Sequence, residues 1–504
     1  MQKYDVIVIG TGAGNIVLEA ALKKGLRCAV IEKGKFGGTC LTRGCIPTKV
    51  LATAADYIRE IKDLPKIGVE VAPATMNWEV VSRRVWEKID EHQKVLGYYK
   101  KQPNLQIYQG KAFFTGEKVL QVKLNDGSLS EEMTADKIFI GVGAQTNLPE
   151  IPGREETGYL CSESLFGPKY PKQPHKSLII VGGGPIGCEF AHIFSAAGTE
   201  VTLVQHNPRL LPREDAEVSE QILHSMEDMG IRVFLNLNLL EARQVNGQKV
   251  LTFEDRLSGE KVELAGEEVM YATGVRPATG GLQLEKTSVV TDDRGWIKTN
   301  EFLETNVEGI WALGDVNGQP AFRHKANYEA EILAHNLFQD NEPCNWRWAC
   351  YDIVPAVTFT YPQVAHVGLS EEQAVKQGYE VKIGKQYYHN TAKGYALGYT
   401  KGESTDGFVK LVVEKATNKM LGMHVIGAQA SILIQPFINL LNLGTRKLKP
   451  IHEEIGSATA KELRSIGLER TLDPHSVISV GETMTPHPSL AEVIMWTQYY
   501  FEGK

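Results

Sequence analysis

Short apolar runs, each followed by a glycine-containing turn and a helical pattern, occur twice in the first half of the chain. Residues 5–10 are apolar and β-branched, residues 16–24 have a helical pattern, and residues 27–32 form a second apolar run. Residues 177–187 and 188–205 repeat this order of strand, turn, helix and strand. Continuous apolar runs are typical of parallel strands buried on both faces. The pattern therefore predicts two βαβ units, which internal duplication would explain.

Between and after these units, the pattern predicts further elements of both types. Residues 151–153, Ile-Pro-Gly, are expected to form a turn and a domain hinge. We predict a charged helical segment at residues 78–101 and a hairpin or meander at residues 105–114 and 119–124. Three strands are expected at residues 137–143, 269–277 and 309–315, and a helix at residues 326–338.

The pattern changes again after residue 356. Four strands separated by turns are expected, followed by helices within residues 431–443. This order predicts a separate α+β domain, with an antiparallel sheet and helices on one side of it. Residues 449–484 are polar and irregular, so no element is assigned there, and an apolar helix containing Trp496 is expected at the end. The four strands are placed at residues 357–362, 379–383, 407–413 and 420–426.

Composition narrows the class of protein. A chain of 504 residues is too long for one core, and 42% hydrophobic with 23% charged residues is ordinary for a globular protein. The net charge of −7 argues against a nucleic-acid partner. We expect no membrane span, because no apolar run is long enough to cross a bilayer. A strand that starts near residue 5 leaves no room for a signal peptide, so a cytoplasmic location is expected.

Cys40 and Cys45 lie just before a helical run that contains Pro47 in its first turn. The helix is expected to start just after Cys45. Free N–H groups and the positive end of the helix dipole would stabilise a thiolate there. We interpret the pair as a redox centre; the alternatives are two buried free thiols or a structural disulfide.

The first glycine turn contains Gly10, Gly12 and Gly14, and the second strand ends at Glu32. Such glycines let the backbone approach a pyrophosphate at a helix N-terminus, and the acid can hold ribose hydroxyls. Asn15 replaces the third glycine of the usual fingerprint, so looser helix–strand packing is expected. The alternative is a βαβ turn that binds no ligand.

The second glycine turn contains all three fingerprint glycines, Gly182, Gly184 and Gly187. Gln205 occupies the position of the ribose-binding acid. An acid would favour NADH and an arginine NADPH, whereas a neutral glutamine favours neither. His206, Arg209 and Arg213 follow and either assist a phosphate or are solvated. We favour NADH, since no arginine directly replaces the acid.

Two further positions are candidates for chemistry. His487 lies between prolines, and Glu492 follows on the next helix, where it could orient the imidazole for proton transfer. A solvated surface histidine is the alternative. Asp315 ends a strand and could bind a polyol, or simply cap the following helix.

These motifs, in this order, resemble the class I flavoprotein disulfide reductases, a family that includes dihydrolipoamide dehydrogenase and glutathione, trypanothione, mycothione and mercuric reductases. The resemblance extends almost from end to end. It rests on residues 10–14, Glu32, residues 40–45 with Lys49, residues 182–187 with Glu189, Gly314 with Asp315, residues 324–326, and residues 487–492.

The resemblance implies an α/β subunit with two Rossmann-like domains, paired as a homodimer. The expected parts are an FAD-binding domain at 1–153, an NAD(P)-binding domain at 154–279, a central domain at 280–350, and an α+β interface domain at 351–504. It also implies sites. Cofactor contacts are expected from Gly10, Gly12, Gly14, Glu32, Gly38, Thr39, Lys49, Gly143, Gly314 and Asp315 for FAD, and from Gly182, Gly184, Gly187, Gln205 and Gly274 for NAD(P)H.

The resemblance further implies how the catalytic residues are arranged. Cys45 would face the flavin and Cys40 would exchange with substrate, while Lys49 would lie near the flavin ring and pair with Glu189. His487 and Glu492 would come from the partner subunit. No metal site is expected, because Cys344 and Cys350 have no second pair or histidine cluster beside them.

We therefore expect a dihydrolipoamide dehydrogenase-like enzyme that acts on a small dithiol or a lipoyl carrier protein. The alternatives are an NADPH-dependent reductase of a low-molecular-weight thiol disulfide, or an FAD-binding protein that has lost thiol turnover. The turn at residues 10–15 is similar to that of mycothione reductases. Mercuric reductase is excluded, because Cys350 is the last cysteine. Two features depart from the pattern of the family. Arg43 lies between the two cysteines, and we hypothesise that it selects an anionic substrate. The polar stretch at residues 449–484 is longer than expected for a member of the family.

Overall fold

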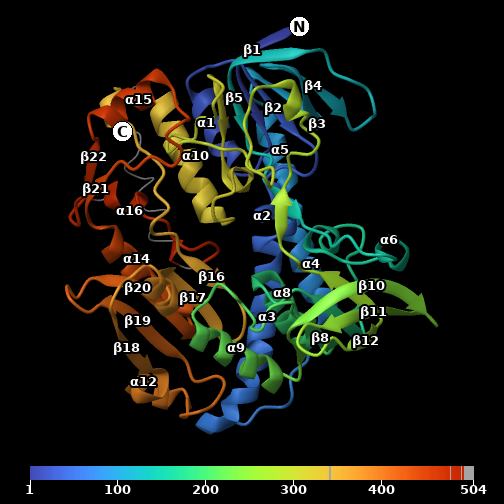
Figure 1. The fold of residues 1–504 in the computed structure, drawn as a ribbon. Helices are drawn as coiled ribbons and strands as arrows, with labels where there is room; N and C mark the ends of the chain where they lie inside the picture. The colour runs from blue at the N-terminus through green and yellow to red at the C-terminus, as the bar shows by residue number, and fades with distance from the viewer. Residues whose placement is uncertain (340–341, 477, 490, 493–504) are drawn as a thin grey trace.

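The computed structural model describes residues 1–339, 342–476, 478–489 and 491–492. Figure 1 shows a sheet of the N-terminal half at the top, a second sheet at the lower right and the sheet of the C-terminal half at the lower left. The expected C-terminal helix with Trp496 lies outside the described residues. Within the described residues, no helix is both long and apolar enough to span a membrane.

The first sheet confirms the first βαβ unit. Five parallel strands are ordered β3-β2-β1-β5-β15, and β4 joins them antiparallel to β3 and β5. The second half of the central strand β1 is buried, with Val6, Ile7 and Val8 at 0% exposure, as expected for a strand covered on both faces. The elements are β1 (Gln2–Ile9), α1 (Gly14–Lys23), β2 (Cys28–Glu32), β3 (Leu105–Gly116), β4 (Val119–Leu124), β5 (Met133–Ile140) and β15 (Ile310–Ala312).

The second sheet confirms the second βαβ unit. Its four strands are parallel in the order β13-β7-β8-β9. An antiparallel ribbon of three strands extends from it at the lower right of Figure 1. The elements are β7 (Ser177–Val181), α8 (Pro185–Ala196), β8 (Glu200–Val204), α9 (Ala216–Asp228), β9 (Arg232–Phe234), β13 (Glu268–Tyr271), and the ribbon β10 (Leu237–Val245), β11 (Gln248–Asp255) and β12 (Lys261–Gly266).

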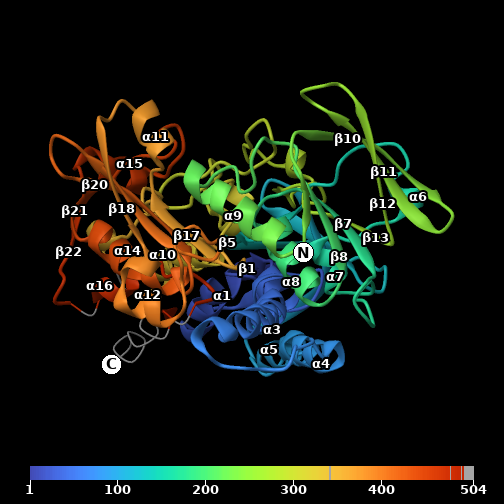
Figure 2. The same ribbon diagram turned by 90° about the horizontal axis from the view of Figure 1, so that it is seen from below.

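The third sheet is antiparallel, as the sequence predicts, in the order β16-β17-β20-β19-β18. One face packs on α13 and α14, and the other contributes Val364, Phe408 and Ile426 to a core shared with the long helix α3 and with α8. Figure 2 shows this sheet beside α3. The elements are α3 (Cys45–Asp63), β16 (Ala356–Thr358), β17 (Gln363–Gly368), β18 (Val381–Tyr387), β19 (Phe408–Glu414), β20 (Met420–Gly427), α13 (Ala430–Leu433) and α14 (Gln435–Asn442).

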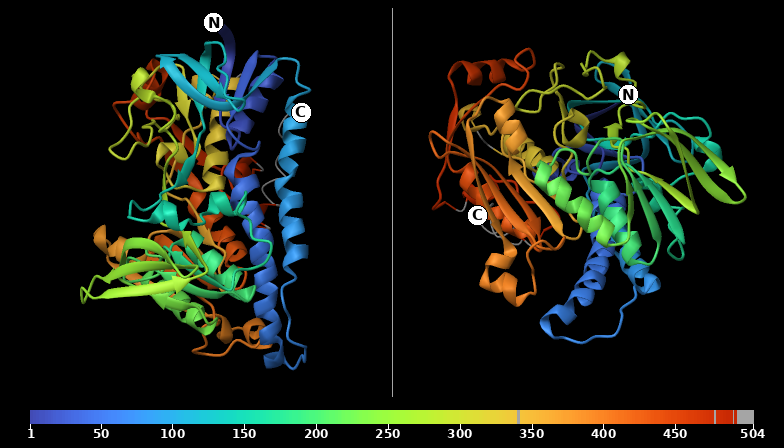
Figure 3. Two further views of the ribbon diagram at one scale, coloured as in Figure 1. Left: turned by 90° about the vertical axis from the view of Figure 1, so that its right-hand side faces the viewer. Right: turned by 60° about the horizontal axis from the view of Figure 1, so that its bottom comes forward.

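Three expected elements differ in detail. Residues 78–101 contain two helices, α4 (Trp78–Ile89), which runs alongside α3 (Figure 3), and α5 (Glu91–Tyr99), which continues from α4. Residues 269–277 are not one strand: Gly274 has φ +94° and turns the chain, so that β14 (Val275–Pro277) pairs with β6 (Ala144–Thr146). The unassigned residues 449–484 contain α15 (Ala458–Ser465), β22 (Glu469–Leu472), which pairs with β21 (Gly444–Lys447), and α16 (Ile478–Gly481).

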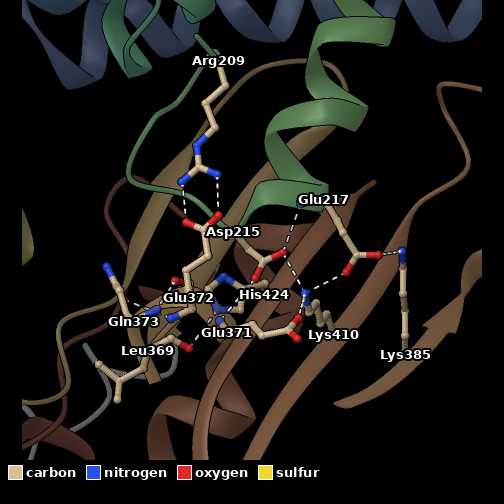
Figure 4. A network of polar contacts seen from close by, with 11 residues as sticks. Arg209, Asp215, Glu217, Leu369, Glu371, Glu372, Gln373, Lys385, Lys410 and His424 are labelled. Carbon is tan, nitrogen blue, oxygen red and sulfur yellow. Dashed lines mark hydrogen bonds and ion pairs between the residues drawn. The ribbon is translucent and has the colours of Figure 1, made fainter. Parts of the chain in front are cut away.

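A buried cation joins the third sheet to the start of α9. Lys410 of β19 is 2% exposed, and its Nζ lies 2.9 Å from Asp215 and 2.7 Å from both Glu217 and Glu371 (Figure 4). Asp215 also caps α9, where it accepts a hydrogen bond from the Glu217 N–H. Burial lowers the pKa of Lys410, but the three carboxylates outweigh it and raise the pKa above its ordinary value.

We expect Lys410→Met to destabilise the fold by about 3–5 kcal/mol, because it leaves the carboxylate of Asp215 buried without its cation. The matched control is Lys415→Met, which removes an exposed ion pair with Glu380 and should cost at most about 1 kcal/mol. Urea unfolding of both variants measures the difference. Equal shifts of the two midpoints would show that the buried cluster contributes no more than a surface pair.

Candidate active site

The two cysteines lie where two helices meet. Cys40 is within α2 (Gly38–Arg43), and Cys45 is the first residue of α3, one residue earlier than the expected helix start. The two sulfur atoms and a ring nitrogen of His487 lie within 4.8 Å of one another. The first-turn N–H groups of α3 and the positive end of its dipole are therefore at Cys45, as the sequence predicts.

The two thiols have opposite electrostatic environments. The hydrogen bond from Cys40 lowers the pKa of Cys45 well below its ordinary value against the effect of burial, and His487 and Lys49 lower it further. The same hydrogen bond and burial raise the pKa of Cys40, although Arg323 acts in the other direction. The arrangement favours a thiolate at Cys45 and a thiol at Cys40.

His487 completes this group through both of its ring nitrogens. Its Nε2 lies 3.0 Å from Cys40 Sγ, and its Nδ1 lies 2.7 Å from Glu492 Oε1. Burial acts to lower the pKa of His487, but contacts with Cys45 and Glu492 outweigh it and raise the pKa to about 9. This contact is made within one chain; supply of the pair by a partner subunit, which the resemblance implies, stays a prediction.

Lys49 and Glu189 form the ion pair that the resemblance implies. Lys49 Nζ of α3 lies 2.6 Å from Glu189 Oε2 of α8 and 4.4 Å from the ring centroid of Phe359. The Phe359 N–H donates to the other oxygen of Glu189 at 2.9 Å. Phe359 is thus a site residue that the sequence reasoning missed. Its position directly after β16 gave no motif to find it by.

The first glycine turn is held against the cysteine helix by a chain of hydrogen bonds. Glu32 accepts hydrogen bonds from the N–H and the hydroxyl of Thr11, at 3.0 and 2.6 Å, and the Thr11 hydroxyl accepts one from Gly37 N–H at 3.1 Å. An added Cβ on Gly38 would lie 2.7 Å from Cα of Gly12. The turn, and with it any bound dinucleotide, is therefore fixed next to α2.

The residues of this turn fit a dinucleotide. A Cβ on Gly10, which has φ +100°, would lie 2.3 Å from the carbonyl oxygen of Gly141, so only glycine is tolerated there. Space remains on the other side: a Cβ on Gly12 would meet only Arg323 Nη1, at 3.8 Å, and one on Gly143 would meet nothing within 4 Å. The open space beside this turn, with the guanidinium of Arg323 at its edge, could hold the negatively charged pyrophosphate of a dinucleotide. The buried oxygen of Asn15 has no hydrogen-bond partner among the described residues, and looser helix–strand packing there stays a prediction.

Arg323 was also missed by the sequence reasoning, although it precedes residues 324–326 of the motif. Arg43 lies near Thr39 and Gly34. Its Nε is 3.5 Å from the Thr39 hydroxyl, and its Nη1 lies 3.8 Å from where a Cβ on Gly34 would be. Gly34 N–H donates to Glu32, so Arg43 lies beside a residue that contacts Glu32, and its role as a selector of substrate stays a prediction.

Asp315 lies within electrostatic range of Arg323, the residue beside Gly12 of the first glycine turn. It belongs to a 3₁₀ turn, η3 (Gly314–Asn317), whereas α10 (Arg323–Phe338) begins after Phe322, so the reading of Asp315 as a helix cap is wrong. Burial raises its pKa, and Lys325 opposes this. The turn is fixed by Glu329, which accepts a hydrogen bond from Gly314 N–H at 2.6 Å.

The second glycine turn has the same construction. A Cβ on Gly182 or Gly187 would lie within 2.3 Å of a carbonyl oxygen, whereas one on Gly184 or Gly274 would meet nothing within 4 Å. Gln205 Oε1 accepts hydrogen bonds from Gly183 N–H at 3.2 Å and His206 N–H at 3.1 Å. Gln205 therefore supports the turn much as Glu32 supports the first one.

Two family profiles match the chain. Pyridine nucleotide-disulphide oxidoreductase covers residues 4–330, and the dimerisation domain of the same family covers residues 354–457. The chain is 32% identical to mycothione reductase of Mycobacterium tuberculosis, over 88% of this chain and 94% of that protein. It is 30% identical to dihydrolipoyl dehydrogenase of Bacillus subtilis, over 100% and 98% of the two chains.

A solved structure of a flavoprotein disulfide reductase has a fold similar to that of this chain. The HOCl-induced flavoprotein disulfide reductase RclA from Escherichia coli, as its Cu(II) complex, is 26% identical with a TM-score of 0.74 and full coverage of both chains. The family supports binding of FAD and a pyridine nucleotide, and its dimerisation domain supports a homodimer. The chain is an enzyme of the pyridine nucleotide-disulphide oxidoreductase family, with the mixed α/β fold of the flavoprotein disulfide reductases.

Proposed function

We propose that this enzyme is an NADH-linked oxidoreductase of the dihydrolipoamide dehydrogenase type, acting on a small dithiol or a lipoyl carrier. The observation that carries the proposal is the polarised group Cys45–Cys40–His487–Glu492, in which each thiol has a distinct environment. Bound FAD would supply a carrier of electron pairs between a nicotinamide and this dithiol.

The chain's own residues account for the sulfur chemistry. In the oxidised enzyme, one substrate sulfur attacks Cys40 of the Cys40–Cys45 disulfide, which forms a mixed disulfide and releases Cys45 as a thiolate. His487 Nε2 takes the proton of the attacking thiol, and Glu492 stabilises the imidazolium. The second substrate sulfur then displaces Cys40, leaving an oxidised substrate and a reduced Cys40–Cys45 pair.

The preference for NADH is supported by the contacts of Arg209 and Gln205, two residues that follow β8. Nη1 and Nη2 of Arg209 donate to the two oxygens of Glu372, at 2.9 and 2.7 Å, so this cation is neutralised by a residue of α11 (Glu371–Lys376). Gln205 uses its carbonyl oxygen to support the glycine turn. Neither residue is set to bind a 2′-phosphate.

A second candidate is the NADPH-dependent reduction of a low-molecular-weight disulfide. It is favoured by the similarity to mycothione reductase and by the shared glycine turn at residues 10–15. The cofactor and the direction of electron flow separate the two candidates.

Anaerobic titration of the flavin spectrum distinguishes them. We expect NADH and dihydrolipoamide to reduce the flavin, and NADPH to do so at least about tenfold less efficiently, a difference of ~1.4 kcal/mol. Reduction by NADPH with no response to dihydrolipoamide, followed by turnover of a glutathione-like disulfide, would favour the second candidate instead.

A further inference from the structure

Two histidines lie opposite one another in the third sheet. His366 of β17 and His424 of β20 are paired in the antiparallel register, and their rings stack with centroids 5.7 Å apart. Side chains alternate between the two faces of a strand, so both histidines share a face with Val364 and Ile426, which pack in the core with α3 and α8. His424 is 1% exposed, and the side chain of His366 is 20% exposed. The pair therefore faces the first half of the chain, with one ring partly open to solvent.

Glu214 brings a carboxylate to these two rings. It lies in the connection between β8 and α9, directly before the cap residue Asp215, and its side chain is 7% exposed. Its Oε2 lies 2.7 Å from Nδ1 of His366. One possible ligand atom from each of Glu214, His366 and His424 lies within 4.8 Å of the other two. Glu214 and His366 are 152 positions apart, so no spacing of residues along the chain indicated this cluster.

The hydrogen bond of His424 leaves one of its ring nitrogens without a partner. Nε2 lies 3.1 Å from the carbonyl oxygen of Leu369 (Figure 4), and because a carbonyl oxygen only accepts, Nε2 carries the proton. Nδ1 is buried and has no hydrogen-bond partner among the described residues. In the neutral ring this nitrogen presents a lone pair. Histidines that bind a metal are usually oriented in this way, with the other ring N–H donated to a carbonyl oxygen or a carboxylate.

The charges around the cluster favour a further cation. Lys410 of β19 is the cross-strand neighbour of His424. Carboxylates outnumber ammonium groups here, four against two, from Glu214, Asp215, Glu217 and Glu371 against Lys385 and Lys410. The nearby ion pair of Arg209 with Glu372 adds no net charge. A divalent cation would therefore reduce an existing imbalance of charge.

We propose that Glu214, His366 and His424 bind one divalent transition-metal ion, with Zn²⁺ as the reference ion. Imidazole nitrogens and a carboxylate oxygen are both good ligands for zinc, and three protein ligands leave a fourth position for water. In a tetrahedral site with bonds of about 2.0–2.2 Å, the ligand atoms lie about 3.3 Å apart, so movements of about 1 Å would bring all three onto one ion. The partly exposed ring of His366 marks the side from which the ion enters.

An ion at this position would join two parts of the chain. Glu214 N–H donates to the carbonyl oxygen of Leu211 at 2.9 Å, and Leu211 N–H donates to that of Gly183, in the second glycine turn, at 2.8 Å. The two histidines belong to the third sheet. The ion would therefore hold the connection after β8, and through it the second glycine turn, against the third sheet. Because the three ligands meet only in the folded chain, binding would stabilise the native state.

Titration of the FAD-containing enzyme with Zn²⁺ tests the proposal. Cys40, Cys45 and His487 also form a group that could bind zinc. The parent protein for the titration is therefore the Cys40→Ser, Cys45→Ser double variant, dialysed against EDTA and then freed of EDTA. Isothermal titration calorimetry should show one tightly bound ion per chain. Absence of tight binding would overturn the proposal.

Two ligand variants in the same background locate the ion. The side-chain amide of His424→Gln can still donate to Leu369, but it lacks the nitrogen at the position of Nδ1. Glu214→Gln keeps the shape of the side chain and removes its charge. Each should weaken Zn²⁺ binding at least about tenfold. Affinities equal to that of the parent in both variants would place the ion elsewhere and overturn the proposal. If His424→Gln does not retain FAD, Glu214→Gln decides the question.

The matched control is His389→Gln. His389 also pairs with a carboxylate, that of Asp406, but it lies outside both groups of possible ligands that the described residues form. Its affinity for Zn²⁺ should stay within about twofold of the parent, as for most changes away from a site. An equal loss of affinity in His389→Gln and His424→Gln would show that zinc binds to histidines without preference, which would contradict the inference.

Two further measurements are independent of the affinity. With one equivalent of Cu²⁺ in place of zinc, electron paramagnetic resonance should show coupling to two imidazole nitrogens in the parent and to one in His424→Gln. Saturating Zn²⁺ should raise the Tm of the parent by at least about 2 °C and leave that of His424→Gln unchanged. A copper spectrum or a Tm shift that is the same in both proteins would overturn the proposal. None of these measurements uses dithiol turnover, so their outcome is independent of the proposed function.

Discussion

Replacing Cys45 by serine should reduce dihydrolipoamide oxidation by at least about a thousandfold, because residues that act as one catalytic unit lose nearly all turnover when one member is removed. Serine keeps the size of the side chain but is not ionised near neutral pH and cannot form the disulfide with Cys40. Reduction of the flavin by NADH should continue, since the second glycine turn is untouched. Stopped-flow absorbance measures both steps in the same sample.

The matched control for this variant is Cys344→Ser. Cys344 is an exposed free cysteine in η4 (Pro343–Asn345), outside the group formed by Cys40, Cys45 and His487. Its substitution should leave both steps within about twofold of wild type, as for most surface changes. Retained dithiol turnover in Cys45→Ser would contradict the dithiol mechanism and leave only a direct transfer from the flavin.

Structural features that depend on a short stretch of sequence were predicted correctly. Both glycine turns and the strands before them follow from local spacing, and so does the start of α3 at the cysteine pair. These predictions succeed because the chemistry depends on backbone geometry within about ten residues. The antiparallel character of the third sheet could also be predicted, since its strands are separated by turns rather than by crossover helices.

Contacts between residues far apart in the chain could not be predicted in this way. Lys410 and Asp215 are 195 positions apart, and Arg464 and Glu301 are 163 apart. From the sequence alone, each of these four charged residues would be expected at the surface, because charged side chains are usually exposed to water. These side chains are buried only because distant parts of the chain pack together. Residues 449–484 show the same limitation, because their polar composition does not reveal the buried ion pairs that Arg464 and Glu482 form.

His487→Gln should lower dihydrolipoamide turnover by about 100- to 10,000-fold, the usual range for loss of a general acid–base group. Burial lowers the pKa of His487, but contacts with Cys45 and Glu492 outweigh it and raise the pKa to about 9. The imidazolium is therefore present at neutral pH and is lost as the pH rises through 9. Because this cation stabilises the thiolate, its removal should raise the pKa of Cys45.

Absorbance of the thiolate at 240 nm, or the rate of alkylation by iodoacetamide, measures this shift against pH. The wild-type profile should titrate well below the ordinary range of a thiol, and His487→Gln should move the midpoint upward by more than one pH unit, or ~1.4 kcal/mol. The control is His389→Gln, because His389 is also paired with a carboxylate, that of Asp406, but lies outside the group formed by Cys40, Cys45 and His487. If the two variants give the same profile, the charge on His487 does not set the state of Cys45, and the helix N-terminus together with Lys49 must do so instead.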